Sequence, residues 1–291
     1  MLVSLYHKFK NMENQRKTWF ITGCSQGIGL ILAKQLLAEG YNVAATARNL
    51  DALKKAIGVS SPQFLPLQVD LVNEESVRSA VASAVAHFKS IDFLVNNAGY
   101  GLIGGIEESS NEEVQASFDI NVFGLLNVTR SVLPHMRAAK SGHIFNMSTV
   151  FGLIAGAGWG IYCGTKFAVE GMSEALAQEV KPFGINVTII EPGYVRTNFL
   201  SSGSIANPKN PIAEYGAIAE EIRKHKEDVP GNQPGDPQKI AEVIISLSKV
   251  SEPPLRILLG SDALQFANYK IQMLQNGIET NKQITLSTDF K

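Results

Sequence analysis

Cysteine is scarce in this chain of 291 residues, and neither sign of charge is in excess. Only Cys24 and Cys163 are present, and they lack the C-x-x-C spacing. This favours a reducing compartment, the cytoplasm, over a disulfide framework. The 26 basic and 27 acidic residues leave a net charge of −1, so the chain offers no basic face for nucleic acid.

Long apolar runs and metal-ligand patterns are missing as well. No stretch reaches the roughly 18 apolar residues that span a bilayer, which predicts a protein without a membrane span. The five histidines are scattered, and none has the spacing of a metal ligand. With 45% hydrophobic and 18% charged residues, the composition is that of a globular chain with one large core.

Three stretches of different character divide the chain. Residues 1–17 are polar after Tyr6 and are predicted to be a flexible lead-in, within which Met12 is a second possible start. Residues 18–275 carry a regular pattern and are predicted to form one ordered domain. Residues 276–291 are polar and are predicted to be a loosely held C-terminal tail.

Strand and helix patterns alternate through the ordered stretch. Residues 18–40 read as a strand, a glycine-rich turn and a helix. Further strands are predicted at 42–47, 64–69, 91–95, 143–147, 185–190 and 255–259, and helices at 73–88, 112–137 and 162–181. This alternation predicts an α/β protein with a single-domain, Rossmann-like, doubly wound parallel sheet of about seven strands and helices on both faces. Ligands of such sheets bind beyond the carboxyl ends of the strands.

The glycine-rich turn suits the phosphates of a nucleotide. Gly23, Gly27 and Gly29 have the spacing G-x-x-x-G-x-G, which differs from the dinucleotide fingerprint G-x-G-x-x-G. Both patterns let the backbone turn tightly and bring its amides to a pyrophosphate at a helix N-terminus. The turn lacks the G-K-[ST] ending of a P-loop, which disfavours nucleoside triphosphate hydrolysis. The other reading is a turn that serves packing alone.

Tyr162 and Lys166 are four residues apart, which places them on one face of the predicted helix. A nearby ammonium favours the phenolate and lowers the pKa of a tyrosine below its usual value of about 10. Such a tyrosine can act as an acid or a base near neutral pH. The pair alone is common on helices, so its meaning depends on the motifs that accompany it.

Together, the motifs resemble those of the short-chain dehydrogenase/reductase family. They are Thr22-Gly23-x-x-x-Gly27-Ile28-Gly29, Asp70, Asn96-Asn97-Ala98-Gly99, Asn121, Ser148, Tyr162-x-x-x-Lys166 and Pro192-Gly193. They cover residues 18–200 in the family's order and spacing. The resemblance implies an enzyme that moves a hydride between a nicotinamide cofactor and an alcohol or carbonyl, and a sheet with the strand order 3-2-1-4-5-6-7.

The resemblance also implies roles for four catalytic residues. Tyr162 would donate a proton to the carbonyl oxygen in reduction and accept one in oxidation. Lys166 would lower the pKa of Tyr162 and hold the nicotinamide ribose. Ser148 would hydrogen-bond the substrate oxygen. Asn121 would anchor a water that feeds protons to Lys166; alternatively, its side chain only satisfies helix backbone groups.

The family motifs and their neighbours predict a cofactor-binding set. The set is Thr22, Gly23, Ser25, Gly27, Ile28, Gly29, Arg48, Asp70, Asn97, Ala98, Gly99, Tyr162, Lys166, Pro192, Gly193, Val195 and Thr197. Within it, Asp70 would contact the adenine, Asn97 would line the cleft, and Thr197 would reach the nicotinamide amide.

The end of the second strand predicts NADP, with NADPH preferred over NADH. An NAD enzyme of this fold usually carries Asp or Glu there, to bind both ribose hydroxyls. Here the strand ends at Ala47 and Arg48 follows, so a guanidinium can pair with the extra phosphate, and Ser25 can add a hydroxyl. The alternative is that Asp51 is the ribose acid, but we expect Asp51 to belong to the first turn of the next helix.

The substrate pocket is predicted to be apolar. Family resemblance places it at residues 100–106, 149–159 and 194–235, which supply Leu102, Ile103, Phe151, Leu153, Ile154, Trp159, Tyr194 and Phe199. This lining favours an apolar or aromatic carbonyl or alcohol, although such residues often only pack under a loop. Residues 194–236 are predicted to be the substrate lid, and the Gly, Pro and Ser residues within 200–236 suggest that it is mobile.

Two other functions stay open at this point. A redox sensor or scaffold could bind the nucleotide without turnover, although such a protein has no need of Ser148, Tyr162 and Lys166 together. A nucleotide-sugar epimerase or dehydratase is the enzymatic alternative; its usual spacing is G-x-x-G-x-x-G. The predicted partners are a small carbonyl or alcohol substrate and, by resemblance, copies of the chain itself in a dimer or tetramer.

Overall fold

The computed structural model describes residues 16–200 and 203–290. The predicted lead-in therefore lies outside the described residues, apart from Arg16 and Lys17.

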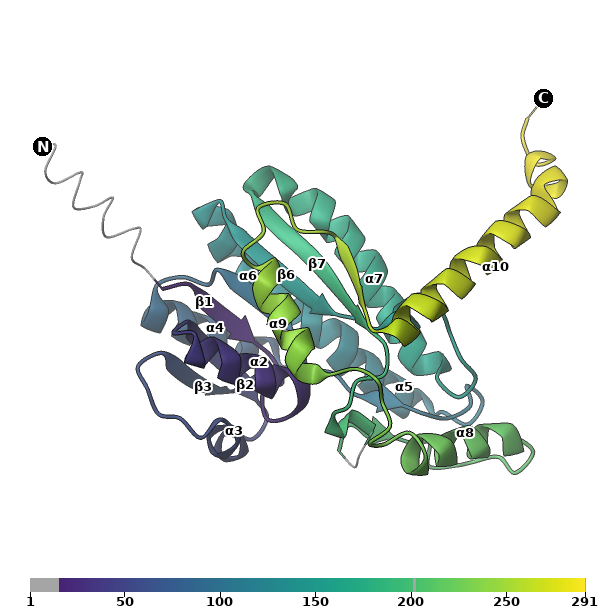
Figure 1. Cartoon of the computed structure of the whole chain (residues 1–291), viewed down its shortest axis with the longest axis horizontal. Coiled ribbons are helices and arrows are strands. Elements are labelled where there is room, and N and C mark those ends of the chain that lie inside the picture. The colour runs from purple at the N-terminus through teal and green to yellow at the C-terminus, as the bar shows by residue number, and fades with distance from the viewer. Residues whose placement is uncertain (1–15, 201–202, 291) are drawn as a thin grey trace, which may run out of the picture.

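A seven-stranded parallel sheet forms the centre of the molecule (Figure 1). Its strands are β1 (Thr18–Ile21), β2 (Asn42–Ala47), β3 (Phe64–Gln68), β4 (Phe93–Asn96), β6 (Gly142–Met147), β7 (Ile185–Pro192) and β9 (Arg256–Leu259). The order is β3-β2-β1-β4-β6-β7-β9, which confirms the predicted fold class and topology.

Helices cover both faces of the sheet. One face carries α2 (Gly27–Ala38), α3 (Leu50–Ile57) and α9 (Pro237–Leu247), and the other carries α4 (Glu74–Phe88), α6 (Leu125–Ala139) and α7 (Gly160–Val180). Successive strand residues feed the two cores alternately, because side chains of a strand point to opposite faces. On β1, Trp19 and Ile21 pack into the first core and Phe20 into the second.

The long helix predicted for residues 112–137 is broken into three parts. It consists of α5 (Asn111–Phe118), a π-helical turn (Asp119–Gly124) and α6. A capping box starts α5, because the Ser110 hydroxyl accepts from the Glu113 amide and the Glu113 carboxylate accepts from the Ser110 amide. The π-helical turn contains Asn121, and such turns are frequent at functional sites.

A small second sheet joins the predicted lid to the rest of the domain. Strand β8 (Ile205–Ala206) pairs in parallel with β5 (Gly101–Leu102), which follows β4. The lid then continues into α8 (Gly216–Glu227), a charged helix on which His225 is the one buried residue among those described. Residues 201–202 of the lid lie outside the described part of the chain.

The C-terminal segment differs from the expected loose tail. Helix α10 (Ser261–Leu286) is 26 residues long and continues through most of the stretch 276–291. It leaves the body of the molecule at its first turns (Figure 1) and buries only Ala263 and Ala267.

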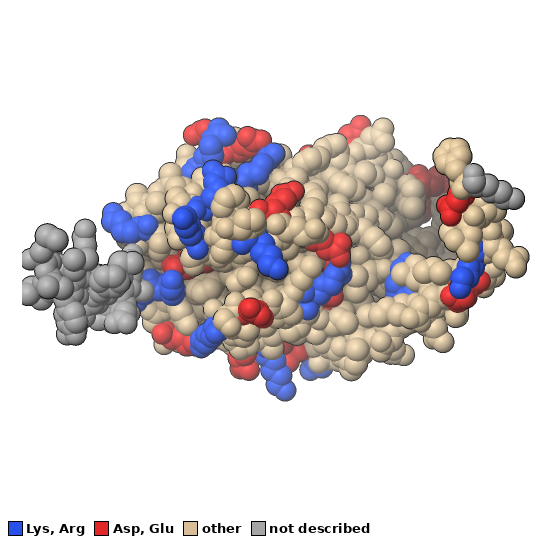
Figure 2. Space-filling model, turned by 90° about the horizontal axis from the view of Figure 1, so that it is seen from above, with Lys and Arg blue, Asp and Glu red and all other residues tan. Residues whose placement is uncertain are grey.

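Blue and red side chains, which carry opposite charges, intermingle over the face of the molecule shown in Figure 2. Among the described residues, no helix combines the length and apolarity that crossing a bilayer requires.

Candidate active site

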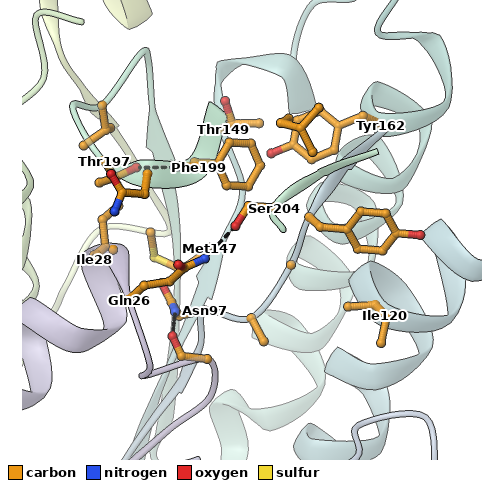
Figure 3. Close-up of a pocket in the computed structure, with 18 of the residues that line it drawn as sticks. Gln26, Ile28, Asn97, Ile120, Met147, Thr149, Tyr162, Thr197, Phe199 and Ser204 are labelled. Atoms are coloured by element: carbon orange, nitrogen blue, oxygen red, sulfur yellow. Dashed lines mark hydrogen bonds between the residues drawn. The ribbon is translucent and has the colours of Figure 1, made fainter. Parts of the chain in front are cut away.

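A cleft of about 690 Å³ lies at the carboxyl ends of the strands. Its walls come from the glycine-rich turn before α2, the ends of β2, β4, β6 and β7, the start of α7, and lid residues 203–206 (Figure 3). The strand order reverses between β1 and β4, and the cleft opens at that switch point, as expected for a doubly wound sheet. The described ranges hold no group of three or more His, Cys, Asp or Glu side chains that could bind a metal ion.

The glycine-rich turn has the backbone shape that a dinucleotide requires. Gly23 and Gly27 have φ angles of 72° and 62°, a region that other residues rarely adopt. A Cβ atom on Gly29 would collide with the side chain of Asn97 and with the Gly23 carbonyl, so only glycine allows this close packing. The N-terminus of α2 has no side-chain cap, and its first residues, Gly27 and Ile28, line the cleft. These features fit a bound pyrophosphate.

Thr22 and Asn97 tie this turn to the loop after β4. The Thr22 hydroxyl accepts from the amides of Asn97 and Ala98, both at 3.0 Å. In return, the Asn97 amide group donates to the carbonyls of Thr22 and Gly23 at 2.9 and 3.0 Å. The Asn97 side chain lines the cleft, but its donors are used to hold the turn in place.

A contact that the sequence did not indicate crosses the cleft. The side-chain amide of Gln26, in the glycine-rich turn, donates to the Ser204 hydroxyl of the lid at 2.7 Å (Figure 3). Gln26 lies within the motif, but a partner 178 residues away cannot be read from spacing. The lid is therefore linked directly to the predicted phosphate-binding turn.

Arg48 lies exposed on the rim of the cleft, directly after β2. Its guanidinium makes no hydrogen bond or ion pair with another described residue. Burial raises the pKa of Tyr100, and the charge of Arg48 opposes that effect. Asp51 lies in the first turn of α3, as expected, and is not part of the cleft wall. Asp70 is also outside the cleft wall, and its carboxylate accepts from the Val72 amide within its own turn.

Tyr162 and Lys166 both lie on α7, both are buried, and both line the cleft. Burial raises the pKa of Tyr162 above its usual value. The ammonium nitrogen of Lys166 is 5.7 Å from the Tyr162 ring centroid and donates to the Met147 carbonyl at 2.8 Å. Burial also lowers the pKa of Lys166 to about 8. The expected lowering of the Tyr162 pKa is thus reversed, because desolvation outweighs the distant charge.

Ser148 and Asn121 are positioned by the elements that precede them. Ser148 follows β6 directly, and its hydroxyl makes a long contact of 3.5 Å with the Thr149 carbonyl. Asn121 does not line the cleft; its amide bonds the Tyr100 backbone at 3.0 and 2.9 Å and reaches the Thr165 hydroxyl at 3.2 Å. The π-helical turn sets the direction of this side chain, which links the α5–α6 region to α7.

Aromatic side chains form the wall opposite the glycine-rich turn. Trp159 lies with its ring centroid 5.4 Å from Phe151 and 5.5 Å from Tyr162. The Tyr194 hydroxyl and His225 Nε2 are 2.8 Å apart. Because His225 Nδ1 faces the Glu221 carbonyl at 2.9 Å, we assign the proton to Nδ1, so that Tyr194 donates to Nε2. His225 thereby fixes α8 against the aromatic wall, which the scattered histidines of the sequence did not reveal.

The structure brings most of the predicted residues together. Those lining the cleft are Gly23, Ser25, Gly27, Ile28, Arg48, Asn97, Ala98, Gly99, Ser148, Tyr162, Lys166, Pro192, Gly193, Val195 and Thr197. Thr22, Gly29, Asp70 and Asn121 lie behind or beside the wall. Of the predicted substrate residues, Phe151, Trp159, Tyr194 and Phe199 line it, whereas Leu102, Ile103, Leu153 and Ile154 do not. Wall residues that the sequence did not single out are Gln26, Leu71, Tyr100, Ile120, Ser204 and Gln233. Of these, Tyr100, Ser204 and Gln233 lie within the predicted pocket segments.

Known proteins with similar sequences are oxidoreductases. Residues 17–206 match the family described as short chain dehydrogenase. An oxidoreductase of Botryotinia fuckeliana is 36% identical over 275 residues, which cover 94% of this chain and 99% of that protein. A 3-ketodihydrosphingosine reductase of Bacteroides thetaiotaomicron is 36% identical over 242 residues, which cover 82% of this chain and 86% of that protein.

Solved structures show the same likeness. A short-chain dehydrogenase from Streptomyces avermitilis matches with a TM-score of 0.87 and 34% identity, over 94% of this chain and 100% of that one. A 3-ketoacyl-(acyl-carrier-protein) reductase from Brucella melitensis, complexed with NADH, matches with a TM-score of 0.72 and 25% identity. The match covers 85% of this chain and 97% of that one. A serine dehydrogenase complexed with NADP+ matches with a TM-score of 0.70 and 26% identity, over 83% of this chain and 94% of that one.

Proposed function

The chain belongs to the short-chain dehydrogenase/reductase family and is an NAD(P)-dependent oxidoreductase, and on this premise we propose that it interconverts a carbonyl and an alcohol with Tyr162 as general acid and base. The observation that supports this most is that Ser148, Tyr162 and Lys166 line one cleft together with the glycine-rich turn. Similarity to oxidoreductases also favours this reaction over an epimerase, a dehydratase or a binding protein without turnover.

Each residue has a defined task in this proposal. The nicotinamide supplies or takes the hydride when bound. Tyr162 gives its proton to the carbonyl oxygen in reduction, and in oxidation its phenolate takes the proton of the alcohol. Ser148 donates a hydrogen bond to the same oxygen and shares its developing charge. Lys166 holds the nicotinamide ribose, and Asn121 anchors the water that resupplies protons to Lys166.

We propose an apolar or aromatic substrate. Phe151, Trp159, Tyr194 and Phe199 line the substrate side of the cleft. Further apolar side chains, Leu200 and Ile205 among them, pack around this wall. A relative of 36% identity carries the name 3-ketodihydrosphingosine reductase, which names a ketone substrate. Among the described residues of this wall, no cation is present that would bind a phosphorylated sugar.

We also propose that NADP(H) is preferred over NAD(H), because Arg48 is the charged residue that the end of β2 presents to the cleft. Its guanidinium is exposed on the rim and can pair with the ribose phosphate in a bidentate manner. Asp51, which could repel that phosphate, lies in the first turn of α3 and away from the cleft wall.

Titration with both reduced cofactors tests this preference. Wild-type protein is expected to bind NADPH more tightly than NADH and to oxidise it in the presence of apolar ketones or aldehydes, followed at 340 nm. Arg48→Ala should weaken NADPH binding by about 1.5 to 3 kcal/mol, the range of a charged hydrogen bond, and NADH binding much less. Lys54→Ala, which removes an exposed cation from α3 outside the cleft wall, is the matched control and should change neither. Equal affinity of the wild type for NADPH and NADH would refute the preference.

For its assembly and location, we propose a homo-oligomer in the cytoplasm. Helix α10 exposes Leu264, Ile271, Leu274 and Ile278 by 51 to 65%. Ile271, Leu274 and Ile278 are spaced by three and four residues, as in helices that pair through a heptad seam. Cys24 and Cys163 are both buried thiols without a disulfide, which fits a reducing compartment.

A further inference from the structure

A buried charge cluster lies behind Ser148 and is not used by the proposed reaction. Glu170 on α7 and Glu191 on β7 are only 4% and 1% exposed. Arg256 on β9 lies between them, with its Nη1 atom 2.9 Å from Glu170 Oε2 and 2.8 Å from Glu191 Oε1. The exposed Glu174 contacts the other terminal nitrogen of the same guanidinium. One cation therefore faces two buried carboxyl groups and a third at the surface.

Two ionised carboxylates are hard to keep at such a place, because burial disfavours each charge and each repels the other. Burial raises the pKa of both groups, and that of Glu191 reaches about 7, with the charge of Glu170 as the second cause. Arg256 opposes these shifts at both groups. A proton on one member of the pair would relieve both the burial of its charge and the repulsion between the two groups.

The other charged groups around Glu170 do not remove this proton. Lys166, one turn earlier on α7, favours the ionised form of Glu170, but burial lowers its own pKa to about 8. Among the described residues, Glu174 of α7, Glu191 of β7 and Arg256 of β9 are the remaining charged neighbours. The carboxylate of Asp262 on α10 instead accepts from the Tyr194 amide at 2.6 Å.

Gly152 brings the Glu170 carboxyl group and the Ser148 hydroxyl into the same space. A Cβ atom on Gly152 would lie 2.5 Å from Ser148 Oγ and 2.7 Å from Glu170 Oε1. Interaction with the Ser148 hydroxyl lowers the pKa of Glu170. Within the described residues, neither Glu170 oxygen has a hydrogen-bond partner of good geometry. Ser148 Oγ in turn makes only its long 3.5 Å contact with the Thr149 carbonyl.

We propose that Glu170 is a positioning residue for Ser148, and that the proton shared by Glu170 and Glu191 decides where the Ser148 hydroxyl points. When Glu170 is a carboxylic acid, its O–H donates to Ser148 Oγ, and the Ser148 proton is left for the substrate oxygen. When the pair loses that proton to solvent, past the 32% exposed side chain of Arg256, Glu170 becomes an acceptor and takes the Ser148 hydrogen bond for itself. This rests on the proposed role of Ser148.

Two isosteric changes should then have opposite effects on reduction. In Glu170→Gln, the amide oxygen faces the donor Arg256, so the NH2 group stays toward Ser148 and imitates the acid. Its kcat should remain within about threefold of the wild type at low pH. The wild-type kcat should decline as the pH rises and the pair loses its proton, and this decline should be absent from Glu170→Gln. In Glu191→Gln, the one remaining carboxyl group is Glu170, ionised beside Arg256. Its kcat should fall by about tenfold or more even at neutral pH, within the range known for loss of one oxyanion donor.

The experiment compares pH profiles of kcat for wild type, Glu170→Gln, Glu191→Gln and Glu174→Gln. The last removes the exposed carboxylate from the same guanidinium and should leave the profile unchanged. NADPH affinity and unfolding temperature, measured in parallel, exclude a loss of fold or of cofactor binding. Infrared spectra give a readout without turnover, because the C=O stretch of the shared acid should titrate in wild type and Glu174→Gln and be absent from both other variants.

The outcomes separate this inference from the proposed function. Wild-type protein that turns over no carbonyl compound overturns the function, while the infrared band still tests the shared proton. Turnover with the same pH profile in wild type and Glu170→Gln overturns the positioning role, as does a band that Glu191→Gln retains. If one variant fails to fold, the other variant and the band of the wild type decide.

Discussion

Tyr162 shows how burial and charge compete at a single residue. Its ring is 6% exposed, and desolvation raises its pKa although Lys166 lies one turn away on the same helix. This burial opposes the lowered pKa that a general acid and base near neutral pH requires. Spacing alone indicated which two side chains share a face, but the balance of burial against charge depends on the packing of α7 against β6 and could not be predicted from sequence.

Removing the Tyr162 hydroxyl should abolish the chemistry and spare the cofactor. Tyr162→Phe keeps the buried ring but has no proton to give, so kcat should fall by about 10²- to 10⁴-fold while the NADPH dissociation constant stays nearly unchanged. Lys166→Ala should damage both, because Lys166 is assigned to the ribose as well. Initial rates measure kcat, and fluorescence titration measures the NADPH dissociation constant.

Tyr100→Phe is the matched control for this change. Tyr100 lines the same cleft, and its hydroxyl has no role in the proposed reaction, so most of the activity should remain. If Tyr162→Phe retained most of the wild-type kcat, the assignment of the general acid would be wrong.

At the scale of elements, the alternation of strand and helix patterns in the sequence predicted the sheet well, because each strand is short, apolar and bounded by turn residues. The strand predicted at 42–47 coincides with β2, and the helix predicted at 162–181 differs from α7 by at most two residues at an end. The π-helical turn at Asn121 escaped prediction, since one extra residue in a turn leaves no mark in periodicity. Helix α10 escaped it because its apolar side chains face no core.

The lid is the element whose motion the structure makes testable. The lid is joined to the body by the pairing of β8 with β5, by the Gln26–Ser204 hydrogen bond, and by further hydrogen bonds from Asn207, Ile212 and Tyr215. Because most side chains of residues 203–236 are exposed, this segment should open locally at lower cost than the core, and its amide hydrogen exchange should be fast in the protein alone. Exchange should slow once NADPH and a substrate analogue are bound, because both order the cleft wall.

Helix α9, which follows the lid directly and packs into the core, provides the internal control. Its exchange should be slow and should not respond to the ligands. Equal protection of residues 203–236 with and without the ligands would show that the lid does not close.

For the whole molecule, α10 predicts association through its exposed apolar stripe. The protein should be a dimer or larger in light scattering coupled to size exclusion, because Ile271, Leu274 and Ile278 are each at least half exposed. Replacing these three with Gln should shift the mass to that of a smaller species without loss of the folded core, since α10 buries only Ala263 and Ala267.

The control for this change replaces Gln272, Gln275 and Glu279, which also lie on α10, with Ala. It should leave the mass as it is in the wild type. A wild type that stays monomeric at micromolar concentration, or a triple Gln variant that associates like it, would remove α10 from the interface.

Helix α10 has a further consequence, which is mechanical. Its first turn is fixed to the cleft, because the carboxylate of Asp262 accepts from the amide of Tyr194 on the aromatic wall. Twenty-six residues of helix extend over about 39 Å from that point. The helix is therefore a lever with its pivot at the cleft, and a rotation of about 5° there carries its far end through about 3 Å. A small rearrangement at the wall would therefore be amplified at the C-terminus of the helix.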